Sequence, residues 1–247
     1  MSALLQAELL KLRTTRTFAA LAVVAVVTSM LLVALTSLTG EPTEDSVLVE
    51  VFSSDTSSLF ILVLAIVGIS GEWRHRTITS SLLAAPDRLR FIAAKTLAFA
   101  AAGAALSLAI SVAVAILGYA IVSWRDLPVP EAGELLALFG RNAIASALLG
   151  ALGVGIGGLV RNQPTAIVGV LLLSFAVEPV VISVLPELAP FGPFIGLPLG
   201  VQDISASDIG FSELDVLSPG LAALGMLAWI GAFFAAAAVL LRSRDVE

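Results

Sequence analysis

The chain is a succession of long apolar runs separated by short polar segments. The apolar runs lie at about 18–38, 53–71, 91–122, 142–160, 165–185 and 221–241. A helix needs about 20 apolar residues to cross a hydrocarbon core of about 30 Å, and these runs are close to that length. The second run is the weakest, and we expect it to begin near Ser53 with Asp55 at the outer surface. The pattern predicts an all-α, polytopic membrane protein with six transmembrane helices in a single domain, residues 1–247.

The segment before the first run, residues 3–16, has a different pattern. Leu5, Leu9 and Leu12 recur at helical spacing on one face, and the charged residues lie on the others. This pattern favours a short helix in the membrane interface over a plain polar tail. The run 18–38 is longer than the apolar core of a signal peptide, so we expect a retained span.

The composition agrees with a protein that faces lipid. Hydrophobic residues make up 58% of the chain and charged residues 13%, and the mean hydropathy is +1.04. Soluble domains are about 25% charged. The chain has no cysteine and a single histidine, His75, which excludes thiol chemistry and leaves little for a metal cage or a Ser–His–Asp triad. We expect no metal site, no nucleic-acid partner and no covalent catalysis.

The distribution of charge predicts an orientation in the membrane. Lys and Arg residues, 11 of 13, lie in segments 1–17, 71–95, 161–164 and 242–247. Asp and Glu residues, 13 of 19, lie in segments 40–56, 123–138 and 187–217. Basic residues favour the cytoplasmic side of a membrane, so we expect both termini to be cytoplasmic.

ATP binding through a P-loop is excluded by the two lysines of the chain. The motif needs a glycine directly before its lysine and a second glycine five positions before the first. Lys95 has Ala94 and Leu89 at those positions, and Lys11 fails as well. We therefore expect that this chain does not bind ATP through a P-loop.

The polar segment between the second and third runs reads GEWRHRTITSSLLAAPDRLRFIAAK, residues 71–95. Ile78 and Leu82 recur at helical spacing, Pro86 ends that helix, and Asp87 is placed to cap the next one. We expect two helices joined by a tight turn on the cytoplasmic face. The segment either contacts a partner or only anchors the protein through its positive charge.

The longest connection, residues 187–217, precedes the last run. Its apolar part from Pro186 to Gly200 contains three further prolines, which exclude a straight helix. The composition fits a re-entrant hairpin and an ordinary surface loop equally well.

Glu178 is an ionisable residue within the fifth run, and such residues are expensive in a membrane. Pro179 follows it, which predicts a kink or break in the helix. Three hypotheses stay open: Glu178 lies on a transport path, it pairs with a cation such as Arg141, or it lies near the outer interface.

The fourth run contains LLGALGVGIGG, in which Gly153 and Gly157 have the spacing of a close helix–helix contact. The contact lies either between two helices of this chain or between two copies of it.

Three segments together resemble the type-two permeases of ATP-binding cassette (ABC) exporters. The segments are ELLKLRTTR before the first run, GEWRHRTI with SLLAAPDRLRFIAAK after the second, and GLVRNQPTAIVG between the fourth and fifth. They are spread over much of the chain, and residues 71–95 are the most specific of them.

The resemblance implies six spans, an interfacial N-terminal helix, re-entrant elements before the last span and a cytoplasmic coupling helix. It also implies a bacterial plasma membrane, a pairing of two identical or different permeases, and separate P-loop ATPase subunits that bind the ATP. The residues that it places at the contact with the ATPase are Glu72, Arg74, Arg76, Ile78, Leu82, Asp87 and Arg88.

Two other classes of function fit the sequence less well. A self-sufficient carrier driven by an ion gradient would carry several ionisable residues at mid-membrane, where the sequence offers Glu178 alone. A membrane-embedded enzyme would need clustered His, Asp or Glu residues, which the apolar runs lack. The sequence therefore favours the exporter permease, and it does not specify the cargo.

Overall fold

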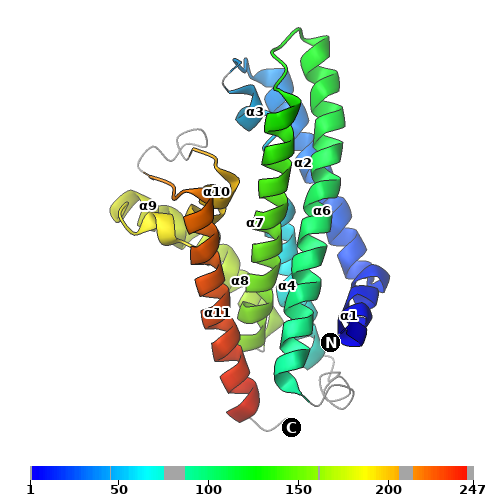
Figure 1. Ribbon diagram of the computed structural model, residues 1–247, viewed down its shortest axis with the longest axis vertical. Helices are drawn as coiled ribbons and strands as arrows, with labels where there is room; N and C mark the ends of the chain where they lie inside the picture. The colour runs from blue at the N-terminus through cyan, green and yellow to red at the C-terminus, as the bar shows by residue number, and fades with distance from the viewer. Residues whose placement is uncertain (1, 45, 75–86, 161, 206–213, 244–247) are drawn as a thin grey trace.

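The computed structural model describes residues 2–44, 46–74, 87–160, 162–205 and 214–243, and all regular structure within them is helical (Figure 1). The α-helices are α1 Ser2–Thr14, α2 Arg16–Thr39, α3 Val47–Glu50, α4 Ser57–Arg74, α6 Arg88–Trp124, α7 Ala132–Leu159, α8 Gln163–Leu172, α9 Glu178–Val184, α10 Gly196–Gln202 and α11 Pro219–Ser243. A π-helix, η1, covers Leu173–Val177, and a 3-10 helix, η2, covers Ala189–Phe191.

Six helical segments are long and apolar enough to cross a membrane. They are Arg16–Thr39, Ser57–Arg74, Arg88–Trp124, Ala132–Leu159, Gln163–Val184 and Pro219–Leu240. Each overlaps one of the six runs expected from the sequence, so the all-helical class and the number of apolar helices are confirmed.

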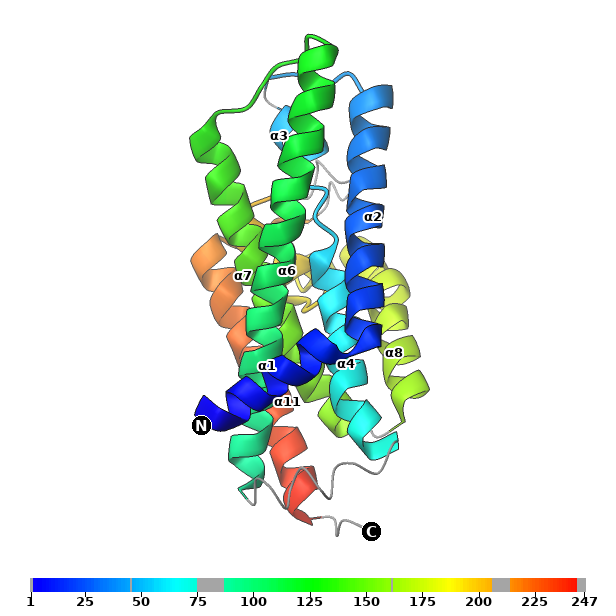
Figure 2. The same ribbon diagram turned by 90° about the vertical axis from the view of Figure 1, so that its right-hand side faces the viewer.

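Helix α7 lies at the centre of the bundle and packs against α4, α6 and α11, while α2 packs on the other side of α6 (Figures 1 and 2). Helix α1 crosses the bundle obliquely at one end, and α3 lies near the other (Figure 2). We call these the α1 end and the α3 end. The arrangement places α1 and the C-terminal part of α11 at the α1 end (Figure 1).

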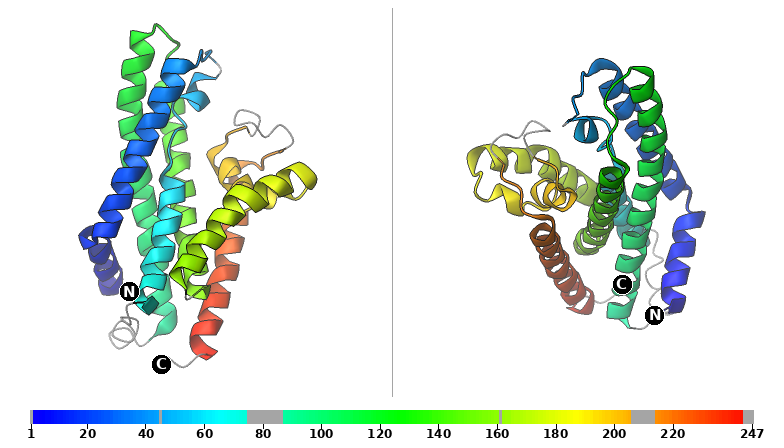
Figure 3. Two further views of the ribbon diagram at one scale, coloured as in Figure 1. Left: turned by 180° about the vertical axis from the view of Figure 1, so that it is seen from behind. Right: turned by 45° about the horizontal axis from the view of Figure 1, so that its top comes forward.

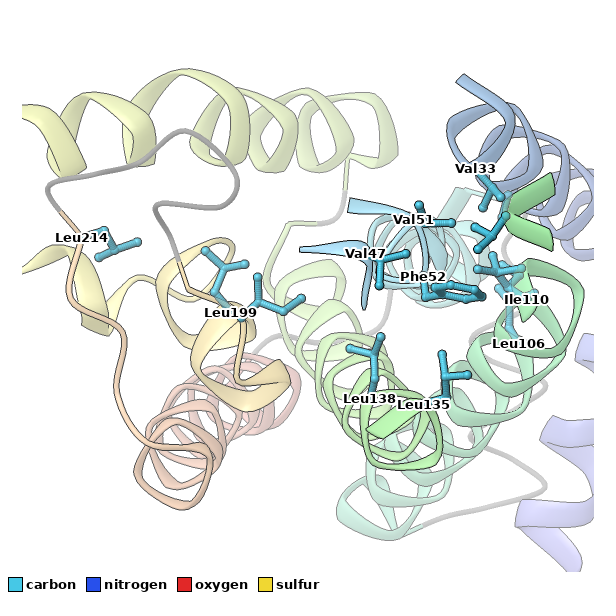
Figure 4. Close-up of a cluster of buried hydrophobic side chains, with 14 of the residues drawn as sticks. Val33, Val47, Val51, Phe52, Leu106, Ile110, Leu135, Leu138, Leu199 and Leu214 are labelled. Carbon is cyan, nitrogen blue, oxygen red and sulfur yellow. The ribbon is translucent and has the colours of Figure 1, made fainter. Parts of the chain in front are cut away.

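The second apolar run differs from its expected form, because the chain is not helical between α3 and α4. Polar side chains in this stretch bind the backbone, since Ser53 Oγ donates to the Val49 carbonyl and Ser57 N donates to Asp55 Oδ1 at 2.8 Å. Such bonds compete with a continuous helix. Phe52 is fully buried beside this break, among side chains of α3, α6 and α7 (Figure 4).

The fifth apolar segment is one bent rod, formed by α8, η1 and α9, that leans away from the rest of the bundle (Figure 3). The π-helix ends one residue before Glu178, and Pro179 follows. Proline has no N–H to donate and its ring crowds the preceding turn, so the regular α-helical bonds cannot continue through it. Of the kink or break expected at Pro179, the structure shows an irregular turn, the π-helix just before Glu178, and no break in the helical segment.

Two short helices, η2 and α10, replace the straight helix that the prolines exclude. Residues 196–201 of α10 are buried, and Gly200 lies close to Leu217 and Ala222 at the start of α11. The segment thus folds back against α11 and α7 instead of extending away from the bundle.

Gly153 and Gly157 lie on the side of α7 that contacts α4. A Cβ on Gly153 would lie 2.6 Å from the Leu62 carbonyl oxygen, and one on Gly157 would lie 2.5 Å from Ile69 Cγ2. Of the two contacts considered for these glycines, the structure shows the one within the chain.

Candidate functional site

Four charged side chains form a compact cluster at the α1 end, which we call the ion cluster: Glu8, Lys11, Glu72 and Lys95. Lys95 Nζ lies 2.7 Å from Glu8 Oε2 and 2.9 Å from Glu72 Oε1. Lys11 Nζ lies 2.7 Å from Glu8 Oε1 and 3.2 Å from the same Glu72 oxygen. Two carboxylates and two ammonium groups balance in formal charge, and the cluster joins α1, α4 and α6.

Burial makes this cluster different from an ordinary surface ion pair. The side chain of Lys95 is 2% exposed and that of Glu8 is 8% exposed, whereas Lys11 is half exposed. Lys95 Nζ also lies 5.4 Å from the centroid of the Phe91 ring. Charges in such a place are stable only with partners, so each helix contributes a group that the other two need.

The cluster shifts the pKa of two of its members. Burial alone would raise the pKa of the Glu8 carboxyl, but the ammonium groups of Lys95 and Lys11 outweigh it and hold that pKa below its ordinary value. Burial would lower the pKa of Lys11, yet the carboxylates of Glu8 and Glu72 raise it above its ordinary value. Both shifts favour the charged forms.

A cavity of about 740 Å³ opens beside the cluster, between α1, the start of α2 and α4. Its wall is mixed, with Lys11 and Arg74 at the polar part and Phe18, Leu64 and Val67 at the apolar part.

The residues expected at the ATPase contact are divided by the structure. Asp87 caps α6, because its Oδ1 accepts from Leu89 N at 3.0 Å and Arg90 N at 3.2 Å, which confirms the expected cap. Glu72 is buried in the ion cluster, and Arg74 is exposed with Gln163 Oε1 at 3.5 Å from its Nη1. Arg88 begins α6. Arg76, Ile78 and Leu82, and the helix expected there, lie outside the described residues.

A second polar group lies deeper in the bundle, around Asp55. Its Oδ1 accepts from Ser57 N, and its Oδ2 accepts from the hydroxyl of Ser107, near the middle of α6. Ser146 of α7 bonds the hydroxyls of Ser57 at 2.6 Å and Ser58 at 2.9 Å. The sequence placed Asp55 at the outer surface, whereas the structure places it between the two ends of α6.

Asp55 lies in the wall of a cleft of about 400 Å³ between α4, α7, η1 and α10, which we call the Asp55 cleft. Its other polar wall residues include Thr56, Ser58, Ser174 and Gln202. The rest of the wall is apolar, with Leu62, Leu149, Phe175 and Phe194 among its members.

Glu178 is buried, and its carboxylate binds the backbone that leads into α10. Oε1 accepts from Ile195 N at 2.8 Å and Gly196 N at 3.1 Å, and Oε2 accepts from Phe194 N at 3.0 Å. The pairing of Glu178 with Arg141 is wrong, because Arg141 Nη1 lies 2.9 Å from Asp203 Oδ2 instead. Glu178 therefore holds the α10 segment against α9.

A third cavity, of about 400 Å³, is almost wholly apolar and lies between α7, α8, α9 and α11. The polar groups at its edge are already bonded. Glu178 accepts from three backbone N–H groups, and Trp229 Nε1 donates to the Phe191 carbonyl at 3.1 Å. This cavity offers few hydrogen bonds to an occupant.

Sequence reasoning missed Glu8, Lys95 and the position of Asp55. Lys95 carried a usable signal, because it is a lysine inside a predicted membrane-spanning run and so needs a partner of opposite charge. Its partner on α1 carried none, since Glu8 reads as one of several polar residues on an amphipathic helix. No three His, Cys, Asp or Glu side chains gather as a metal site in the segments that the structure describes.

The fold and these sites define a class: a polytopic helical membrane protein with six candidate spans and a buried ion cluster at one end. No protein-family model matches the sequence, and no curated protein matches it.

Proposed function

We propose that the chain is the membrane-spanning permease subunit of an ATP-driven exporter, with hydrolysis carried out by separate P-loop ATPase subunits. In this proposal both termini and residues 71–95 face the cytoplasm. The support for this orientation is that the segments assigned to the cytoplasmic side carry 11 of the 13 basic residues. Two permeases line the path of the cargo, and membrane lipid surrounds them.

The ion cluster is the observation that carries the proposal. Residues 75–86 connect α4 to α6, and Glu72 and Lys95, near the joined ends of these helices, form an ion pair with each other and with α1. A force applied to this loop by a docked ATPase would move three helix ends together. That is what a transmission element needs, since ATP acts on the permease only through a difference in ATPase affinity for its two states.

The proposal is tested by copurification from membranes. A variant with Arg74, Arg76 and Arg88 changed to Glu should lose the ATPase, or lose the stimulation of its hydrolysis, while the permease stays in the membrane. Arg13→Glu is the matched control, because Arg13 is exposed on α1 and outside the loop. An intact, fully stimulated complex carrying the three reversed charges would contradict the coupling role.

The second candidate is a carrier driven by an ion gradient, and Asp55 is the observation that favours it. The structure adds Asp55 to Glu178 as a second carboxylate between the ends of the bundle. Gradient-driven carriers use such groups to bind the coupling ion. Uptake by the purified chain in proteoliposomes, driven by an imposed gradient and without ATP, would favour the carrier over the exporter.

A further inference from the structure

Asp55 is a partly buried carboxyl group that no cation in the described residues pairs with. The groups that donate to it, among them Ser57 N and the Ser107 hydroxyl, are neutral, and no ion pair of the described residues includes it.

The other charged groups near the Asp55 cleft are already bonded. Arg141 forms an ion pair with Asp203, the residue after Gln202. The carboxylate of Glu178 accepts hydrogen bonds from three backbone N–H groups. The potential in the cleft is therefore set by Asp55. Water is scarce beside apolar side chains, and a charge acts there over a longer distance than it does in bulk water.

The remainder of the wall is largely apolar and favours an occupant that has apolar surface. Leu62, Leu149, Phe175 and Phe194 present apolar surface, and the hydroxyls of Thr56 and Ser58 are the neutral polar groups closest to Asp55 in the chain. An ion with apolar substituents would bury them against these side chains and bring its charge to Asp55.

We propose that the Asp55 cleft binds a lipophilic monovalent cation, such as an organic ammonium or phosphonium with bulky apolar substituents. Describing that cation as cargo rests on the proposed function. The volume of about 400 Å³ is within the range of about 300–1,000 Å³ that is usual for small-molecule sites.

Two ions of the same shape and opposite charge test the proposal: tetraphenylphosphonium and tetraphenylborate. The full-length protein is placed in lipid nanodiscs, binding of each ion is measured by equilibrium dialysis, and the uptake of empty nanodiscs is subtracted. The protein should bind the phosphonium saturably and the borate at least about tenfold more weakly. Equal saturable binding of the two ions, or saturable binding of neither, would overturn the proposal.

Asp55→Asn removes the charge and keeps an acceptor for Ser57 N, so the start of α4 keeps its bond. It should weaken phosphonium binding about tenfold. Glu134→Gln is the matched control, because it removes the same charge from an exposed position on α7 and should leave binding unchanged. Unchanged phosphonium binding by a well-folded Asp55→Asn variant would overturn the proposal.

Gln202→Lys is a second variant that leaves the Asp55 bonds intact, in case Asp55→Asn does not fold. Gln202 lies in the wall of the cleft and donates to Asn142 Oδ1 at 3.0 Å, a bond that a lysine can also make. The added cation should lower phosphonium binding and raise borate binding, and the opposite change would overturn the proposal. Since these measurements need no ATPase, their failure would leave the exporter proposal standing, and a missing ATPase would leave the cation site standing.

Discussion

Lys95 Nζ on α6 lies 2.7 Å from Glu8 Oε2 on α1, although 87 positions separate the two residues in the chain. The ammonium is 2% exposed, so it depends on this carboxylate and on Glu72 for stability. The contact fixes where the first helix lies against the bundle. It also makes the position of α1 sensitive to any movement of the ends of α4 and α6.

Lys95→Met should destabilise the protein strongly, because it removes the buried one of the two ammonium groups that pair with the buried carboxylates of Glu8 and Glu72. Loss of one partner from a buried pair costs about 3–5 kcal/mol. Lys11→Met is the control, since Lys11 is half exposed and should cost about 1 kcal/mol or less. The measurement is the thermal unfolding midpoint in detergent. Equal losses for the two variants would show that burial of Lys95 does not matter.

The docking of α1 should depend on pH at both extremes. The pKa of Glu8 is lowered in the folded protein, so its contribution is complete above its unfolded value of about 4.3 and is lost as pH falls through the folded value. The pKa of Lys11 is raised, so its contribution is complete below about 10.4 and is lost as pH rises through the folded value. We expect α1 to stay docked between about pH 5 and pH 10.

This pH window can be measured as a distance between two spin labels. The sequence contains no cysteine, so cysteines introduced at Ala7 on α1 and Ala101 on α6, both exposed, would carry the only labels. The distance should lengthen in acid, and Glu8→Gln should remove the acid transition. A distance that changes near pH 7 would contradict the assignment to Glu8 and Lys11.

Gly157→Ala should destabilise the contact between α4 and α7. Its Cβ would lie 2.5 Å from Ile69 Cγ2 and 2.9 Å from Ile66 Cα, and overpacking of this kind costs about 1–3 kcal/mol. Gly169→Ala is the control, since a Cβ there meets nothing within 4 Å and alanine favours a helix. Unfolding midpoints in detergent should therefore move in opposite directions. An unfolding midpoint that Gly157→Ala leaves unchanged would contradict a close contact between α4 and α7 at Gly157.

Glu178→Gln should loosen the α10 segment. The amide nitrogen of glutamine is a donor, so it cannot accept from Phe194 N or from Ile195 N in place of a carboxylate oxygen. An unpaired buried N–H costs about 1–3 kcal/mol. Limited proteolysis should cut faster between residues 187 and 217, while Glu187→Gln, at an exposed position, should match the unchanged protein. Equal cleavage rates for the two variants would contradict the claim that Glu178 holds the α10 segment in place.

Hydrophobic periodicity was sufficient to predict the six apolar helices, because each one must expose apolar surface over a length fixed by the bilayer. Local chemistry was sufficient for the cap at Asp87 and the irregularity at Pro179, since both depend on residues within one helical turn. The sequence also offered the contact of Gly153 and Gly157 within the chain as one of two alternatives.

Long-range polar contacts could not be read from the sequence. The pairing of Glu8 with Lys95 depends on the angle at which α1 crosses the bundle, which no local pattern encodes. Asp55 was misplaced because the second apolar run was taken as one helix, whereas the side chains of Ser53 and Asp55 bind the backbone where the helix is interrupted. Arg141 was the one partner suggested for Glu178, and its actual partners are backbone N–H groups that no side-chain pattern reveals.

Thiol labelling in intact cells tests the central claim most directly, since the sequence has no native cysteine to interfere. Ser80→Cys lies in the segment 75–86 that follows α4 in the sequence, and Ser123→Cys lies at the far end of α6, where the residue is exposed. A membrane-impermeant maleimide should label Ser123→Cys in intact cells and Ser80→Cys only after the membrane is opened. Labelling of Ser80→Cys in intact cells would contradict an ATPase-facing loop and the exporter account with it.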